Sequence, residues 1–465
     1  MNTLNKILMW LKESRKAKNF IFFILSLGLA LLLTRLVRDS GFTDSQDYVL
    51  FLLFFSIGLW LTEAIPPFTV ALFIMAYLVF TLGNPRLNEQ PENISKYVNT
   101  FSNSIIWLML GGFFLAEAMT KTGIDIYFFR FSLRLSGNKP RNILLGLMLT
   151  TMVASMILSN TATTSMVLAS VMPLLSRQQG KTLPKAILAG VPMAASLGGM
   201  GTIIGSPPNA IAIGALENHG IPLSFLRWML FGIPLAVVLT FAGWWLLGWK
   251  FVKESTPIQI ELPEAGNRDN KSKKMDRAIV LVVLILTVLL WLTSSLLRLT
   301  VASISVLPIV SLTMTGILTA SDIRKLPWDT LLLVAGGLSL GLSLQETHLL
   351  EHFTHHILGT GWNTTVLLLV FAYLTMIFSN IMSNTATSTI LIPLGIYMVP
   401  DDALRIAVTV GLAASTALLL PVSTPPNAIA YSTGMIKQKD FLFGGVLVGL
   451  LGPILIVALV SVLLG

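Results

Sequence analysis

Two short polar motifs, each present twice, decide how this chain folds. Residues 159–163 read Ser-Asn-Thr-Ala-Thr and return unchanged at 383–387. Residues 206–212 read Ser-Pro-Pro-Asn-Ala-Ile-Ala and return at 424–430 with Thr in place of Ser. The two offsets are 224 and 218 residues, in the same order along the chain, so the sequence contains an internal repeat.

A third and weaker match supports this repeat. Gly111-Gly112, in a run that begins at Trp107, aligns with Gly336-Gly337, in a run that begins at Trp328. Its offset is 225 residues. Three matches in one order predict two structurally equivalent halves.

The sequence around the motifs is that of a membrane protein. Of 465 residues, 54% are hydrophobic and only 11% are charged, whereas soluble domains carry about 25% charged residues. A soluble domain and a disordered chain are both excluded. Cysteine is absent, which excludes a disulfide framework, a thiolate nucleophile and a Cys-ligated metal. We expect an all-α polytopic protein in a lipid bilayer.

Apolar runs predict about eleven transmembrane helices, since one span needs about 20 apolar residues. Two further regions, 143–175 and 364–399, carry the Ser-Asn-Thr motif at their centres, and their arms of about 15 residues are short for a crossing. We expect re-entrant hairpins there, because non-helical backbone at membrane depth must line a protein or water cavity. The expected helices span 20–37, 48–65, 68–82, 105–122, 186–216, 226–250, 278–296, 300–318, 330–345, 404–434 and 441–464.

The net charge of +9 is explained by orientation in the membrane. The basic N-terminus precedes an apolar stretch without a small-residue cleavage site, so we expect a retained first helix. With the N-terminus cytoplasmic and the C-terminus outside, 24 of the 31 Lys and Arg residues fall inside and 7 outside. Nucleic acid is therefore not an expected partner, and a bacterial inner membrane is the expected location.

The repeat divides the chain into four parts. Five crossings separate corresponding helices such as 48–65 and 278–296, so the two repeats should have inverted topology. Inverted repeats are typical of secondary transporters, whose binding site lies at the midplane between them. The expected parts are 1–47, an N-terminal cytoplasmic segment with the first transmembrane helix; 48–252, the first repeat, with hairpin 143–175 and broken helix 186–216; 253–277, a cytoplasmic linker; and 278–465, the second repeat, with hairpin 364–399 and broken helix 404–434.

Each Pro-Pro-Asn motif predicts a break within a long apolar run. Ser206 and Thr424 are suitable N-caps, and Pro is favoured at the first helical position. A half-helix should therefore begin after each of them, with its N–H groups and positive dipole end in the membrane interior, where an anion is favoured. The alternative is a Pro kink without a ligand.

The Ser-Asn-Thr tips offer oxygens to a hard cation and donors to a carboxylate. Ser155 and Ser379 lie four residues upstream of Ser159 and Ser383, on the same helix face. No Lys or Arg lies in either tip or beside either break. A bound anion must then be balanced by helix dipoles and co-bound cations, which couples their binding. The alternative is that these hydroxyls only bond their own helix backbone.

Other polar residues in the sequence have less specific interpretations. Glu63 and Glu117 could relay protons, but a structural role near a cytoplasmic helix end is favoured. A hydrolase that uses Ser159 or Ser383 would need a general base, and every His falls in an expected outside loop. His348, His352, His355 and His356 have metal-compatible spacing, yet with Glu346 and Glu351 beside them they favour a solvated helix over a zinc site.

Paired Ser-Asn-Thr tips, each followed by a Pro-Pro-Asn break, resemble the divalent anion:sodium symporter family, the INDY-type dicarboxylate transporters. The run Thr62-Glu63-Ala64-Ile65-Pro66 is similar to that family's second-helix signature. The resemblance implies a homodimer with a scaffold domain and a mobile transport domain that carries both hairpins and both broken helices. It further implies import of C4 dicarboxylates such as succinate, malate and fumarate, or of citrate, coupled to sodium by an elevator motion. No enzymatic activity and no organic cofactor are expected.

By motif position, the resemblance also implies a substrate site and two sodium sites. Met382 and Ser423 would contribute backbone carbonyls to the second ion, and Ser379 and Ser423 stand where family members often have Thr and Ala. The substrate would be lined by Asn160, Thr161, Ser206, Asn384, Thr385, Thr424 and Pro425; one sodium would be held by Ser155, Ser159, Asn160 and Gly205, and the second by Ser379, Met382, Asn384 and Ser423.

Two alternatives for transport stay open. Some relatives exchange dicarboxylates without net sodium coupling. A proton-coupled or exchange transporter of another divalent oxyanion, such as citrate or sulfate, with Glu63 or Glu117 as the relay, is the second hypothesis.

Overall fold

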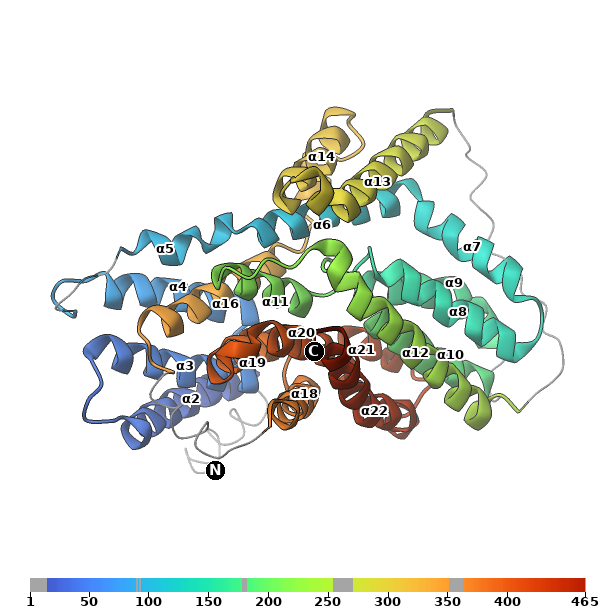
Figure 1. Ribbon diagram of the computed structural model, residues 1–465. Coiled ribbons are helices and arrows are strands. Elements are labelled where there is room, and N and C mark those ends of the chain that lie inside the picture. Colours follow the sequence, from blue (N-terminus) through green and yellow to red (C-terminus); the bar gives the residue numbers. More distant parts are fainter. Residues whose placement is uncertain are drawn as a thin grey trace, which may run out of the picture.

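The computed structural model describes residues 15–88, 91, 93–177, 182–253, 271–350 and 363–464, and all regular secondary structure in these ranges is helical (Figure 1). The all-α prediction is confirmed for these residues. Most of the expected linker, together with Glu351, His352, His355 and His356, lies outside the described ranges.

The first half of the chain runs through the helices that the apolar pattern predicts, with a few short additions. It comprises α2 (Arg15–Val37), α3 (Asp44–Thr62), α4 (Pro67–Leu82), α5 (Ser95–Val98), η1 (Asn99–Ser102), α6 (Ser104–Thr122), α7 (Ile124–Ser136), α8 (Pro140–Ser155), α9 (Asn160–Arg177), α10 (Leu183–Gly199), α11 (Pro207–Asn218) and α12 (Phe225–Phe251).

The second half has the same order of long helices. It comprises α13 (Lys271–Leu297), α14 (Val301–Met314), α15 (Ala320–Ile323), α16 (Trp328–Glu346), α18 (Thr364–Ile381), α19 (Asn384–Met398), η2 (Pro400–Asp402), α20 (Ala403–Ala413), η3 (Ala414–Thr416), α21 (Pro425–Ser432) and α22 (Gln438–Leu464).

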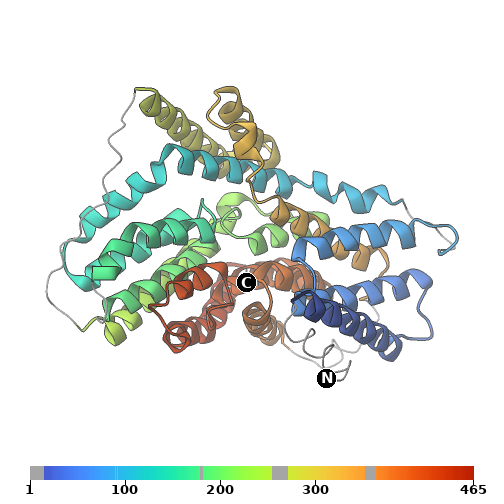
Figure 2. The ribbon, with the colours of Figure 1, turned by 180° about the vertical axis from the view of Figure 1, so that it is seen from behind.

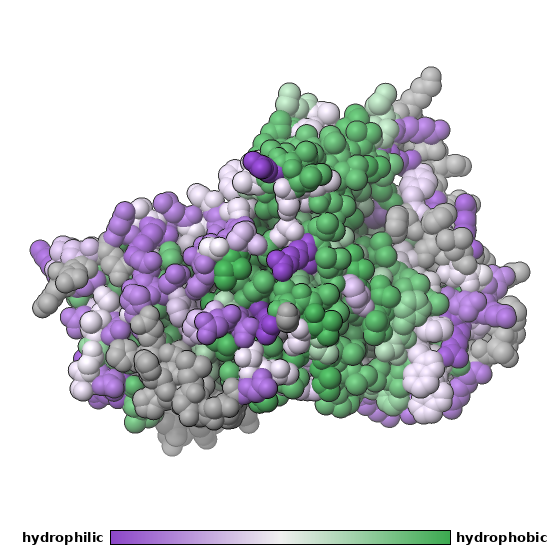
Figure 3. All heavy atoms as spheres, in the orientation of Figure 1, coloured by the Kyte–Doolittle hydropathy of each residue, from purple (hydrophilic) through white to green (hydrophobic). Residues whose placement is uncertain are grey.

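Seven helices of the described chain are long and apolar enough to cross a membrane, and two shorter apolar helices, α4 and α14, accompany them. The expected count of eleven therefore stays a prediction. Only 11% of the apolar window of α2 and 28% of that of α13 are buried inside the protein, so both present long apolar faces outward. Figure 3 shows hydrophobic side chains gathered over α13, α14, α12 and α22, with hydrophilic residues at the two flanks.

One helix, α7, lies between the expected helix 105–122 and the expected hairpin 143–175, where the sequence analysis predicts no helix. α7 follows α6 directly, and Gly123 between them has φ of +74°, which glycine adopts without strain. Arg277, near the start of α13, fixes this turn: its Nε donates to the Thr122 carbonyl oxygen and its guanidinium lies over the Tyr127 ring. Arg130 and Arg134 interrupt the apolar pattern of α7, so a search for long apolar runs does not find this helix.

The two Gly-Gly pairs let α6 and α16 pack closely on both sides. An ideal Cβ on Gly111 would lie 2.8 Å from Ser305 Cβ of α14, and one on Gly336 would lie 2.4 Å from Ala71 Cβ of α4. The second glycine of each pair faces the motif regions: Gly112 approaches Ile204 and Gly337 approaches Thr389. Each of these helices is therefore held between an outer helix and a motif-bearing segment.

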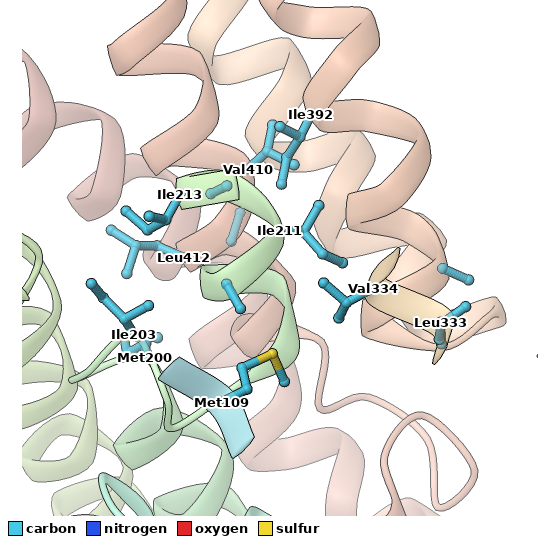
Figure 4. Packing of buried hydrophobic residues seen from close by; sticks show 14 of the residues in the cluster. Met109, Met200, Ile203, Ile211, Ile213, Leu333, Val334, Ile392, Val410 and Leu412 are labelled. Carbon is cyan, nitrogen blue, oxygen red and sulfur yellow. The ribbon is translucent and has the colours of Figure 1, made fainter. Parts of the chain in front are cut away.

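The hairpin segments lie on opposite sides of the centre. In Figures 1 and 2, the α8–α9 pair occupies one side and α19 the other, with α20 and α21 between them. The core between the halves is apolar: Figure 4 shows Ile211 of α11 beside Val334 of α16, and Ile213 beside Leu412 of α20. Burying such side chains contributes about 1.5–3 kcal/mol each where water is the reference.

Candidate functional site

The first Ser-Asn-Thr motif forms the tip between α8 and α9. α8 ends at Ser155 and α9 begins at Asn160. The fully buried Ser155 hydroxyl donates to the Asn160 side-chain oxygen, 2.6 Å away. The Ser159 hydroxyl accepts from the Ala162 backbone N–H at 3.1 Å, so Ser159 acts as an N-cap and its side chain is exposed.

Asn160 lies directly against the first break. An ideal Cβ on Gly199 would be 2.6 Å from Asn160 Oδ1 and 3.0 Å from the Gly205 carbonyl oxygen. Only glycine leaves room for the asparagine side chain there. The structure thus brings together Ser155, Asn160 and Gly205, three of the four residues expected to hold the first sodium, while Ser159 uses its hydroxyl to cap α9.

The first break, residues 200–206, is stabilised by donors that bind carbonyl oxygens of the break and of Gly199, the last residue of α10. The Asn209 side-chain amide donates to Gly199 at 2.9 Å and to Thr202 at 2.7 Å, and the Trp228 indole donates to Met200 at 3.0 Å. Gly232 of α12 permits close approach, since a Cβ there would lie 2.1 Å from the Met200 carbonyl oxygen. The break is a built structure rather than a simple kink.

The second break, residues 417–424, repeats this design at matching positions. The Asn427 amide donates to the Leu420 carbonyl oxygen at 3.0 Å and to that of Leu418 at 3.5 Å. A Cβ on Gly445 of α22 would lie 2.4 Å from the Leu418 carbonyl oxygen. The asparagine of each Pro-Pro-Asn motif therefore joins the half-helix to its own break, a role that the sequence analysis did not assign.

The half-helices begin where the Pro-Pro pairs predict, but their caps differ. α21 begins at Pro425, and the Thr424 hydroxyl accepts from the Asn427 N–H at 3.3 Å. α11 begins at Pro207, and Ser206 occupies the N-cap position in extended conformation without a side-chain cap bond. Both residues therefore occupy the expected N-cap positions, and only Thr424 also caps its helix through the side chain.

The second Ser-Asn-Thr motif lacks the hydrogen bond that closes the first. Ser383 caps α19 by accepting from the Ala386 N–H at 3.1 Å. The Ser379 hydroxyl and the Asn384 side-chain oxygen are both buried without a hydrogen-bond partner. Such atoms are costly unless a ligand completes them. Hydroxyl and amide oxygens suit a hard cation such as sodium, so these residues fit the expected second ion.

Ser423, the last expected ligand residue, is held by a neighbour that the sequence analysis missed. Its hydroxyl donates to the Asn380 side-chain oxygen at 2.8 Å, and the Leu419 N–H donates to the same oxygen at 2.9 Å. Met382, between α18 and α19, is buried and extended. The sequence feature that could have identified Asn380 is its position within an apolar hairpin arm, because a polar residue in a membrane usually has a specific role.

The halves meet through crossed pairs of helices. α9 of the first hairpin contacts the half-helix α21, and α19 of the second hairpin contacts the half-helix α11. All four helices begin at motif residues, so each contact joins a hairpin helix of one half to a half-helix of the other. Of the expected substrate residues, Thr161 and Pro425 are exposed, Asn160, Asn384 and Thr385 are half-buried, and Ser206 and Thr424 are buried.

The remaining candidates do not assemble into a second site. Glu63 lies at the C-terminal end of α3 and is exposed, and Glu117 lies five residues before the end of α6. His219 caps the end of α11 through Nδ1 and the Ala215 carbonyl oxygen. Within the described ranges, no three His, Cys, Asp or Glu residues lie close enough to hold a metal ion.

Comparison with known families and sequences agrees with this geometry. Residues 57–417 match the family described as citrate transporter, CitMHS. The chain is 30% identical to a sodium-dependent dicarboxylate transporter, SdcS, of Staphylococcus saprophyticus, over 99% of this chain and 96% of that protein. It is 28% identical to SdcS of Staphylococcus aureus, over 98% of this chain and 94% of that protein.

Two solved structures share the fold at low identity. The YdaH transporter of Alcanivorax borkumensis aligns with a TM-score of 0.56 and 12% identity, over 85% of this chain and 98% of that one. MtrF of Neisseria gonorrhoeae, of a class of antimetabolite efflux pumps, aligns with a TM-score of 0.55 and 13% identity, over 86% and 96%. Both are membrane transporters, in keeping with the helical architecture described above.

Proposed function

Since this chain belongs to the citrate transporter family and is a transporter rather than an enzyme, we propose that it imports C4 dicarboxylates such as succinate, malate and fumarate together with sodium ions. The SdcS relatives, which are named as sodium-dependent dicarboxylate transporters and match over nearly their whole length, support this choice of substrate and ion.

The observation that carries the proposal is the pair of buried oxygens without partners, Ser379 Oγ and Asn384 Oδ1. A desolvated amide oxygen without a donor favours a cation, and a hydroxyl oxygen can serve as a further ligand of such an ion. A sodium ion there would complete both groups and add positive charge beside the N-terminus of α19. The first ion would similarly use the Asn160 side-chain oxygen and the Gly205 carbonyl oxygen, which lie 2.6 and 3.0 Å from an ideal Cβ on Gly199.

The dicarboxylate would bind between the helix N-termini and the Thr and Asn side chains of the two tips. Residues 156–163, 200–209, 382–388 and 417–427 contain no charged residue. Each helix end is equivalent to only about half a positive charge, so one end beside each carboxylate would leave about one of the two negative charges unbalanced. Bound sodium would supply the rest, so each ligand would raise the affinity for the other.

The transport cycle we propose is an elevator motion in a homodimer. The two hairpins and two half-helices would move together as one body, which their crossed contacts support. The outer helices α2, α3, α4, α13 and α14 would form the scaffold. The protein would reside in a bacterial inner membrane, as the staphylococcal relatives suggest, with its N-terminus cytoplasmic and its C-terminus outside.

Citrate is the second candidate substrate, and the family description favours it. A thermal-shift screen of the purified protein separates the hypotheses: succinate, malate, fumarate, citrate and sulfate are each added in sodium and then in potassium. We expect C4 dicarboxylates to raise the melting temperature only in sodium. Equal rises of the melting temperature in potassium would contradict sodium coupling. A rise with citrate or sulfate alone would mean that this anion, and not a C4 dicarboxylate, is the substrate.

A further inference from the structure

Asn380 joins the second hairpin to the second break through a side chain whose oxygen and nitrogen both form hydrogen bonds. It lies on α18, is 5% exposed, and its oxygen accepts from both the Ser423 hydroxyl and the Leu419 N–H. Its amide nitrogen donates to the Met376 carbonyl oxygen at 2.7 Å. An amide oxygen has two acceptor positions, so both are occupied by groups of the break.

The first half makes the corresponding connection by a different route. By the 224-residue offset, Asn380 corresponds to Met156, whose side chain has no hydrogen-bond donor. There the Thr202 hydroxyl of the break donates to the Met156 backbone carbonyl oxygen. Both halves tie hairpin to break at the same position, but only the second half does so through a hairpin side chain that substitution can remove.

The groups around Asn380 are those assigned above to the second sodium ion. Ser379, with its unpartnered buried hydroxyl, precedes Asn380 in the chain, and Asn384 follows one turn later. Ser423, on the other side of the bond, precedes Thr424, the cap of α21. The hairpin ligands and the break ligand belong to separate segments, so their spacing depends on what joins those segments.

We propose that Asn380 is a positioning residue for the second sodium site: it holds Ser423 against the hairpin, so that the carbonyl of Ser423 faces Ser379 and Asn384 before the ion arrives. This inference rests on the proposed function. Ligands fixed in advance cost less free energy to order on binding. Asn380 therefore sets the affinity for sodium while leaving dicarboxylate recognition, which uses the caps and helix ends, intact.

The test uses Asn380→Ala, Ser423→Ala and the double variant in the full-length protein. The sodium concentration for half-maximal uptake and the KM for succinate at saturating sodium are both measured. We expect Asn380→Ala to raise the sodium requirement ~10-fold, the equivalent of losing about one net hydrogen bond, with the KM for succinate unchanged. Ser423→Ala keeps its backbone carbonyl and should raise the sodium requirement less. The Ser423 hydroxyl also accepts from the Leu420 N–H at 3.0 Å, so the double variant should slightly exceed Asn380→Ala. It should still fall short of the sum of the two single effects, because the two changes share one hydrogen bond.

Two further variants separate positioning from general damage. Met156→Leu, at the equivalent position of the first half, should leave the sodium requirement unchanged. Asn380→Asp keeps an acceptor for Ser423 and Leu419 and should retain most of the sodium affinity that Asn380→Ala loses.

The possible results distinguish this inference from the proposed function. The role of Asn380 is overturned if Asn380→Ala leaves the sodium requirement unchanged. It is also overturned if the sodium requirement and the KM for succinate rise together; in both cases sodium coupling stands. If Asn380→Ala does not fold, Ser423→Ala decides: an unchanged sodium requirement in that variant overturns the role of Asn380. Uptake by the unaltered protein that ignores sodium overturns the proposed function and this inference together.

Discussion

The hydroxyl of Ser155 donates a hydrogen bond to the side-chain oxygen of Asn160 across 2.6 Å, whereas its counterpart in the second half, Ser379, is buried with no partner at all. Two serines at equivalent positions of one repeat thus differ in what they contribute to the protein without ions. In the first tip the serine and the asparagine pair with each other, and in the second tip the oxygens of both residues lack a partner.

Removing these two hydroxyls should have opposite effects in potassium. Ser379→Ala deletes an unsatisfied buried group, which costs about 1–3 kcal/mol, so its melting temperature without sodium should be unchanged or higher. Ser155→Ala loses a hydrogen bond and leaves the Asn160 oxygen without it, so its melting temperature should fall. Thermal unfolding in potassium measures both.

The melting temperatures of the same variants in sodium test whether Ser379 binds the ion. Ser379→Ala should lose most of the stabilisation that sodium gives to the unaltered protein, because a ligand of the second ion is missing. A Ser379→Ala protein that is less stable in potassium, and that sodium stabilises normally, would show that the hydroxyl is a structural group only.

The asparagines of the Pro-Pro-Asn motifs should be structural. Asn209→Ala and Asn427→Ala each remove donors to break carbonyls, and we expect a loss of about 1–3 kcal/mol of stability in each case. Asn209 should matter more, because its two bonds, at 2.9 and 2.7 Å, are shorter than those of Asn427, at 3.0 and 3.5 Å. Melting temperatures in sodium and in potassium should fall equally; a loss seen in sodium alone would make these residues ligands.

Close packing of α12 and α22 on the breaks gives a third prediction. A Cβ at Gly232 or Gly445 would lie 2.1 or 2.4 Å from a carbonyl oxygen, so Gly232→Ala and Gly445→Ala should both lower the melting temperature and the yield of folded protein. Gly28→Ala is the matched control, since nothing lies within 4 Å of a Cβ there. Equal stability of all three variants would mean that the breaks do not pack as described.

The ion pair between Lys121 and Asp322 predicts a defined pH dependence. Its 2.5 Å contact, with further bonds from Thr319, holds the pKa of Asp322 well below its usual range. Folding therefore favours the ionised carboxylate, and this stabilisation is complete above the unfolded pKa of about 3.9 and is lost as the pH falls toward the folded value.

Asp322→Asn should accordingly lower the melting temperature by the same amount at pH 6 and pH 8. The difference from the unaltered protein should shrink only in acid, below about pH 4. Asp329→Asn, which alters an exposed carboxylate on α16, is the control. If the lower melting temperature of Asp322→Asn returned to that of the unaltered protein between pH 8 and pH 6, the lowered pKa of Asp322 would be contradicted.

The strongest sequence signals were those with a direct local cause. Pro207 and Pro425 begin helices because proline lacks an N–H that the first turn does not need, and the observed helices start at those residues. Asn160 and Asn384 begin the inner hairpin helices after serines that accept a backbone N–H. Both patterns could be recognised in this one sequence because each of them occurs twice.

The residues that were missed act through contacts between distant segments. Asn380 reaches Ser423, 43 positions later, and Trp228 reaches Met200 across a helix boundary. No spacing rule links such pairs, because the fold alone brings them together. The difference between the Ser155 and Ser379 environments was likewise hidden, since the two motifs are identical in sequence over 159–163 and 383–387.

The most direct test of sodium-coupled dicarboxylate import is uptake of labelled succinate by proteoliposomes under an inward sodium gradient. Asn160→Ala and Asn384→Ala should abolish uptake while the protein stays folded, and Asn142→Ala, at an exposed position on α8, should leave it unchanged. We predict accumulation with sodium and none when potassium replaces it. Equal uptake in both salts would contradict the account.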